Sequence, residues 1–179
     1  MKKRVISSLA VLSCCITLSG CGINASIEPM TYDYQQAHKT AKKPANKNLI
    51  HAITVAEVKG GHTINPLLAP EVSNENYKLA LEKSLQNAQL LQEGSPGDYS
   101  LQATIERFER PIAGFDFTAT LVVNYKLTKS NKIIFDKTIT SSHTAKMSDS
   151  FIGVTRLKMA NEGSARNNIK QLINDLYKI

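Results

Sequence analysis

The chain has 179 residues, a length that suits one domain of ordinary size. Lys and Arg number 22 against 15 Asp and Glu, which gives a formal net charge of +7. Three of the positive charges lie in residues 1–20, and the remaining +4 is too small an excess to indicate a nucleic-acid partner.

Residues 1–20 have the pattern of a secretory signal peptide. Lys2, Lys3 and Arg4 give a positive start, and residues 5–18 are uncharged and mostly apolar. This apolar run is shorter than the roughly 20 residues that a membrane-spanning helix needs, and it matches the hydrophobic region of a signal peptide.

The end of this segment, residues 18–21 (LSGC), resembles the lipobox of bacterial lipoproteins. The resemblance implies that residues 1–20 are removed and that Cys21 becomes the acylated N-terminus. Cys14 and Cys15 then leave with the signal peptide, so no disulfide or cysteine metal site is expected. The alternative is an ordinary cleaved signal with a cysteine there by chance. Because Gly22 is not an aspartate, the resemblance also implies sorting to the outer membrane, with the domain facing the periplasm.

Residues 21–48 are expected to form the acylated N-terminus and a flexible tether. They show no apolar periodicity and contain prolines and several lysines. A flexible chain of this length has a root-mean-square reach of about 30 Å, which would let the domain stand off the membrane. Residues 49–179 are expected to form a single α+β domain.

The apolar periodicity of residues 49–179 changes between period two and helical spacing. Ser73 or Asn74 can cap the first helix. The expected elements are a strand at 50–58 ending at Gly60–Gly61, a helix at 74–92, strands at 99–108, 115–128 and 133–145, and a C-terminal helix up to residue 176.

The order β-α-β-β-β-α predicts an α+β two-layer sandwich. Residues 115–128 alternate apolar and polar most regularly, which is typical of an antiparallel sheet covered on one face. We therefore expect a mainly antiparallel four-stranded sheet with two helices on that face.

No catalytic or metal-binding motif is evident. None of the four histidines His38, His51, His62 and His143 lies within five residues of another, and neither H-E-x-x-H nor G-x-S-x-G occurs. We predict no cofactor, no metal and no enzymatic activity. The lower-ranked alternative is an envelope enzyme that uses scattered carboxylates with His62 or His143.

Two apolar stretches have two interpretations each. In AGFDF (residues 113–117), either Gly114 makes a turn and both phenylalanines enter the core, or Phe115 and Asp116 form a contact surface. Phe151 and its apolar neighbours either cover the core or form an interaction surface. Gly163, in the last helix, either lets that helix pack closely on the sheet or breaks it in two.

The chain resembles a group of small bacterial outer-membrane lipoproteins. The likeness rests on GGHTINP (60–66), SNENYKLALEKSL (73–85), GFDFTATLVVNYKL (114–127) and FIGVTRLKMANEGSARNNI (151–169). The layout is also similar to the auxiliary lipoproteins of envelope transport. From these motifs we predict a partner surface formed by Gly60, Gly61, Asn65, Pro66, Gly114, Phe115, Asp116, Phe151 and Arg156.

The expected function is therefore that of a lipid-anchored, non-enzymatic envelope protein. Its periplasmic domain would bind a protein partner as an accessory module in envelope assembly or transport. The alternative binding function is that of a lipid- or glycan-binding module, in which the sheet and helices part to hold an acyl chain.

Overall fold

The computed structural model describes residues 25–38, 44–61, 72–94, 96–111 and 113–179. Cys21 and the candidate residues Asn65 and Pro66 lie outside these ranges. The elements are α1 (Ile27–Met30), α2 (Tyr34–Ala37), the 3-10 helix η1 (Lys47–Leu49), β1 (Ile53–Lys59), α3 (Asn74–Asn87), β2 (Tyr99–Glu109), β3 (Phe117–Lys129), β4 (Lys132–Ala145) and α4 (Gly153–Leu176).

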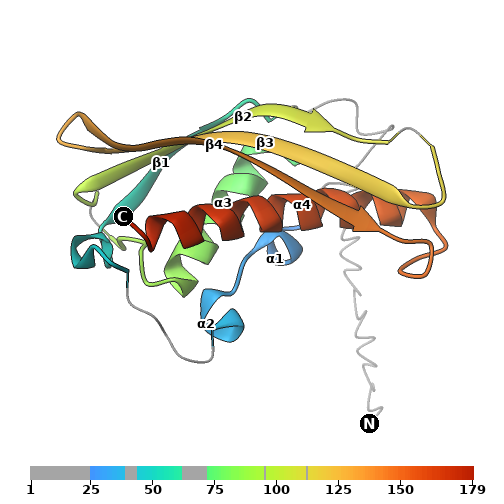
Figure 1. Ribbon diagram of the computed structural model, residues 1–179, viewed down its shortest axis with the longest axis horizontal. Helices are drawn as coiled ribbons and strands as arrows, with labels where there is room; N and C mark the ends of the chain where they lie inside the picture. The colour runs from blue at the N-terminus through green and yellow to red at the C-terminus, as the bar shows by residue number, and fades with distance from the viewer. Residues whose placement is uncertain (1–24, 39–43, 62–71, 95, 112) are drawn as a thin grey trace, which may run out of the picture.

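One four-stranded sheet organises the fold. Its strand order is β1-β2-β3-β4, with β1 parallel to β2 and the other two pairings antiparallel. Helices α3 and α4 lie on the same side of this sheet (Figure 1). The predicted α+β sandwich, with two helices on one face of a mainly antiparallel sheet, is confirmed.

The alternation in β3 decides which face of the sheet is buried. From Ala119 to Leu127 every second residue of the strand, among them Leu121, Val123 and Tyr125, is fully buried under the helices. The opposite face is polar, and there Thr118 and Thr144 are joined by a hydroxyl hydrogen bond of 2.8 Å across β3 and β4. This pattern is what a sheet covered on one side requires.

Helix α3 is shorter than expected, whereas α4 ends at the expected residue. The side chain of Ser73 caps α3 by accepting a hydrogen bond from the Asn76 amide at 3.1 Å. The helix ends at Asn87, earlier than expected, because Gln89 adopts a positive φ of 56° and the chain turns back to bury Leu90. Helix α4 is continuous through Gly163, so the interpretation of this glycine as a helix break is wrong.

The largest difference from the sequence-based expectation is at the N-terminus. The predicted flexible tether over residues 21–48 is wrong for residues 25–37, which we call the docked segment. It contains α1 and α2 and lies on the side of α3 and α4 away from the sheet (Figure 1). The side chains of Met30 and Tyr34 are buried, whereas those of a flexible tether would be exposed to solvent.

Hydrogen bonds hold the docked segment on both long helices. The amide of Ser26 donates to the Glu162 carboxylate of α4 at 2.6 Å, and the amide of Tyr32 donates to the Ser84 hydroxyl of α3 at 2.8 Å. At the far end of α4, the ring of Tyr34 lies 4.3 Å from that of Tyr177, measured between centroids. The segment therefore adds a third layer to the domain.

Replacing Met30 with alanine tests whether the docked segment belongs to the folded domain. Because Met30 is completely buried, we expect Met30→Ala to lower the free energy of unfolding by about 2–4 kcal/mol, measured by urea denaturation followed by circular dichroism. Met147→Ala is the matched control, since Met147 is exposed and its loss should cost about 0.5 kcal/mol or less. Equal effects of the two substitutions would mean that residues 25–37 are not docked in solution.

Candidate functional site

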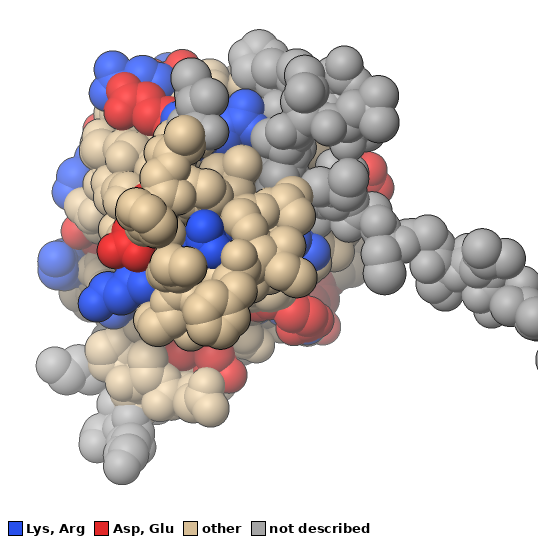
Figure 2. All heavy atoms as spheres, turned by 90° about the vertical axis from the view of Figure 1, so that its right-hand side faces the viewer, with Lys and Arg blue, Asp and Glu red and all other residues tan. Residues whose placement is uncertain are grey.

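Five large apolar side chains are exposed at one end of the domain, and we call them the end patch. They come from the residues before β3, the loop after β4 and the start of α4. The exposed fraction reaches 78% for Phe115 and 83% for Phe151. The other members are Met147, Ile152 and Val154. Figure 2 views this end of the molecule and shows a largely uncharged surface, with a basic group near its middle and other charged side chains around its edge.

Beneath the end patch, Phe117 and Arg156 form a packed floor. Phe117 packs with a small cluster of buried alanines from β3, β4 and α4. The guanidinium carbon of Arg156 lies 5.0 Å from the centre of the Phe117 ring, and its Nη1 donates to the Ser150 carbonyl at 2.6 Å. Since this space is already filled, Phe115 and Phe151 have no core to enter at this end.

Hydrogen bonds fix the loop that carries part of the end patch. Asp116 accepts a hydrogen bond from the Met147 amide at 3.0 Å, which ties the start of β3 to the loop after β4. Within that loop the Asp149 carboxylate accepts from the Lys146 amide at 2.8 Å. The exposed apolar side chains are therefore displayed on an ordered loop.

The structure brings together only some of the residues predicted to form the partner surface. Gly114, Phe115, Asp116 and Phe151 lie at the end patch. Arg156 was predicted to lie on the surface, but only 6% of it is exposed, because its long side chain lies over Phe117 beside the Ser150 carbonyl.

The two glycines at the end of β1 have structural roles. Gly60 has a φ of 81°, and a Cβ atom there would lie 2.0 Å from the carbonyl oxygen of Ile105. The amide of Gly61 donates to the Asn74 side chain at 2.7 Å, at the start of α3. Asn65 and Pro66 lie outside the described residues, so their place in the predicted surface stays a prediction.

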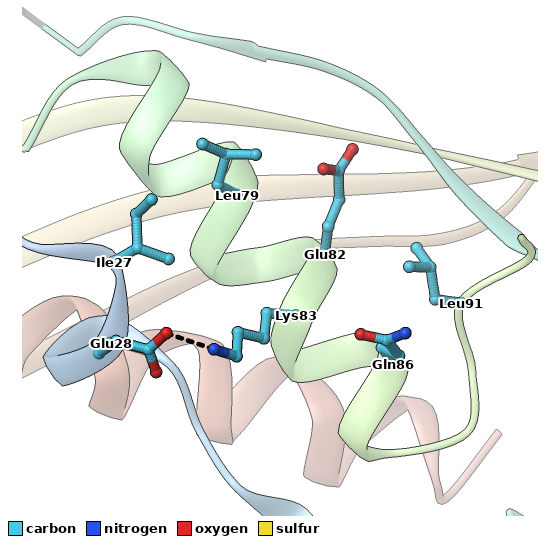
Figure 3. Close-up of a pocket in the computed structure, with 7 residues that line it drawn as sticks. All are labelled: Ile27, Glu28, Leu79, Glu82, Lys83, Gln86 and Leu91. Carbon is cyan, nitrogen blue, oxygen red and sulfur yellow. Dashed lines mark hydrogen bonds and ion pairs between the residues drawn. The ribbon is translucent and has the colours of Figure 1, made fainter.

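A second candidate site is an open hollow between α1 and α3 (Figure 3). Glu28 and Lys83 face each other there and form an ion pair. The remaining lining residues are Ile27, Leu79, Glu82, Gln86 and Leu91. Because Glu28 and Lys83 neutralise each other at the rim, the hollow offers little that would orient a small ligand.

Buried hydroxyl and amide groups meet in the core between the sheet and α4. The hydroxyl of Tyr125 donates to Oδ1 of Asn168 at 2.8 Å, and the hydroxyl of Tyr77 bonds to that of Tyr125. Burial raises the pKa of both tyrosines, so both hydroxyls stay protonated as hydrogen-bond donors. Both side chains are completely buried, which makes this network structural.

Catalytic chemistry has no evident centre in the part of the chain that the structure describes. No three His, Cys, Asp or Glu side chains there group closely enough to hold a metal ion. Burial, with a smaller contribution from the positive charge of Arg166, lowers the pKa of His143, whose ring packs against Gly163. His62 lies outside the described residues.

Comparison with known proteins supports the fold. No protein-family model matches the chain, and no curated protein matches it. Among solved structures, a hypothetical protein of Chlamydia trachomatis is similar over 70% of this chain and 95% of its own, with a TM-score of 0.50 and 8% sequence identity. This likeness supports the α+β arrangement alone.

Two further solved structures show weaker likenesses. A candidate lipoprotein of Caulobacter crescentus is 16% identical over 72% of this chain and 89% of its own, with a TM-score of 0.48. A minor lipoprotein of Acinetobacter baumannii is 8% identical over 72% and 91%, with a TM-score of 0.43. Neither likeness indicates what this chain binds.

Proposed function

We propose that this chain is a lipid-anchored, non-enzymatic envelope protein that works by binding, as an accessory module in envelope assembly or transport. The observation that carries the proposal is the end patch, where Phe115 and Phe151 are displayed on an ordered loop and strand end. Large apolar groups gathered on a surface mark sites of contact with proteins or membranes.

The anchor in this proposal is the acylated Cys21, and the compartment is the periplasmic side of the outer membrane. Support comes from the sequence: the positively charged start, the uncharged apolar run and the LSGC motif at residues 18–21. The envelope protein partner predicted from the sequence is part of the proposal.

Among the helices of the described residues, none is both long and apolar enough to cross a bilayer.

Replacing Cys21 with alanine tests the anchor. In a bacterium that acylates lipoproteins, we expect the chain with its wild-type sequence to be recovered from the membrane with the added mass of its acyl groups, measured by intact-mass spectrometry. Cys21→Ala should lose that added mass and leave residues 1–20 uncleaved, because the modified thiol is missing. Cys15→Ala is the matched control and should be acylated normally. Normal acylation of the Cys21→Ala variant would overturn the proposal. So would the absence of acyl groups from the chain with the wild-type sequence.

A further inference from the structure

The docked segment determines how far the domain can stand from an anchor at Cys21. Ala25 is buried, and its carbonyl accepts a hydrogen bond from the Asn76 side chain at 2.9 Å. Cys21 is four residue steps before this fixed point, and a fully extended chain of four steps spans at most about 14 Å. The anchor is therefore held close to the folded domain, and the reach of about 30 Å expected for a flexible tether does not apply.

The docked segment also leads toward the end patch. Its contacts with α4 move steadily along that helix: Tyr34 lies against Tyr177, the Pro29 carbonyl accepts from Arg166 at 3.1 Å, and the Ser26 amide donates to Glu162. Followed toward its N-terminus, the segment thus runs from the end of α4 toward its beginning.

The start of α4 is where part of the end patch lies. Glu162 is nine residues from Gly153, the first residue of α4, a rise of about 14 Å along the helix. A chain that spans about 14 Å from Ala25 is thus long enough to place the anchor beside the end of the domain that carries Phe151 and Val154. A bilayer that holds the anchor is then an apolar surface within reach of these side chains.

We propose that the end patch inserts into the lipid bilayer that holds the acylated Cys21, so that the domain rests on the membrane by this end. This inference rests on the proposed function, because it requires the anchor. Apolar side chains of interfacial proteins enter the boundary between headgroups and acyl chains by about 5–10 Å, a depth suited to side chains displayed on a loop. The polar outer face of the sheet would then remain in water.

The absence of tryptophan from the chain gives a direct test. The full-length protein carrying Phe151→Trp is produced with its signal peptide, purified in acylated form and reconstituted into vesicles of phosphatidylethanolamine and phosphatidylglycerol. Half of the preparations contain lipids with brominated acyl chains, which quench tryptophan on contact. Phe151 is mostly exposed, so the substitution does not disturb the core, and Val154→Trp provides a second reporter.

The matched control is Ile133→Trp. Ile133 is also exposed, but it pairs with Thr128, eleven residues along β3 from Phe117, which is about 36 Å along the strand. We expect brominated lipid to reduce the emission of Phe151→Trp and Val154→Trp at least about twofold, because the reporters lie at acyl-chain depth. The emission of Ile133→Trp should not change.

Each outcome separates the two proposals. Missing acyl mass, or failure to float with the vesicles, overturns the proposed function and this inference with it. Acylated protein that floats but shows equal quenching at residues 151 and 133 overturns only the inference. Blue-shifted emission of Phe151→Trp without quenching by brominated lipid also overturns it, because a second copy or a protein partner would then cover the patch.

Discussion

Replacing Asn168 with alanine should lower the free energy of unfolding by about 2–4 kcal/mol, because the substitution leaves buried polar groups unpaired and opens a cavity. The Nδ2 group of Asn168 donates to the carbonyls of Leu121 and Ile139 at 3.2 and 2.9 Å, which connects α4 to β3 and β4. Its Oδ1 accepts from the Tyr125 hydroxyl. Urea denaturation followed by circular dichroism measures the change.

Asn124→Ala is the matched control for this prediction. The Asn124 side chain lies on the polar outer face of the sheet and donates to Asp136 at 3.0 Å, where water can replace the lost bond. We expect a change of about 0.5 kcal/mol or less. If Asn168→Ala is as mild as this control, the network between the sheet and α4 does not contribute to stability.

The substitution Gly163→Ala should also destabilise the domain, by about 1–3 kcal/mol, although alanine favours a helix by about 1 kcal/mol over glycine. A Cβ atom at residue 163 would lie 2.1 Å from Cδ2 of His143, so the ring or the helix must move. The close approach of α4 to β4 therefore depends on the missing side chain at this position.

Replacing His143, the residue that the new Cβ atom would meet, gives the control for Gly163→Ala. In a His143→Ala background the ring is gone, so Gly163→Ala should become neutral or stabilising by up to about 1 kcal/mol, as expected from helix propensity alone. A double-mutant cycle of unfolding free energies measures this reversal. An unchanged effect of Gly163→Ala in the two backgrounds would show that the ring of His143 does not set the helix position.

The sheet and its helices were predictable because each segment carries its own periodicity. In β3 the apolar residues recur at every second position, and the turn before β4 follows from Ser130 and Asn131, which both adopt positive φ. The docked segment has no such periodicity. Its apolar side chains, such as Met30, are buried by the groove between α3 and α4, which are distant in sequence, so composition alone indicated a tether.

The candidate site was predictable in part. Phe115 and Phe151 stood out as aromatic residues next to turns. The alternation of residues 115–128 placed Phe115 on the buried face, but β3 begins only at Phe117 and Phe115 is exposed. Met147 was missed, since a single methionine in a polar loop carries no local signal. Arg156 was placed on the partner surface from its motif, whereas in the structure its aliphatic stem and guanidinium pack on the ring of Phe117.

The docking of the N-terminal segment would link the position of the proposed anchor at Cys21 to the completion of folding. The bond between Ser26 and Glu162 spans 136 residues, so it can form only once nearly the whole chain is available. Contacts between residues so far apart in sequence form slowly, because the entropy of the intervening loop must be lost before the contact stabilises the fold. If the exported chain is acylated at Cys21, the segment between the anchor and the folded part of the chain would be long at first. It would become shorter when residues 25–37 dock. The distance of the domain from the membrane would then depend on whether the domain is fully folded.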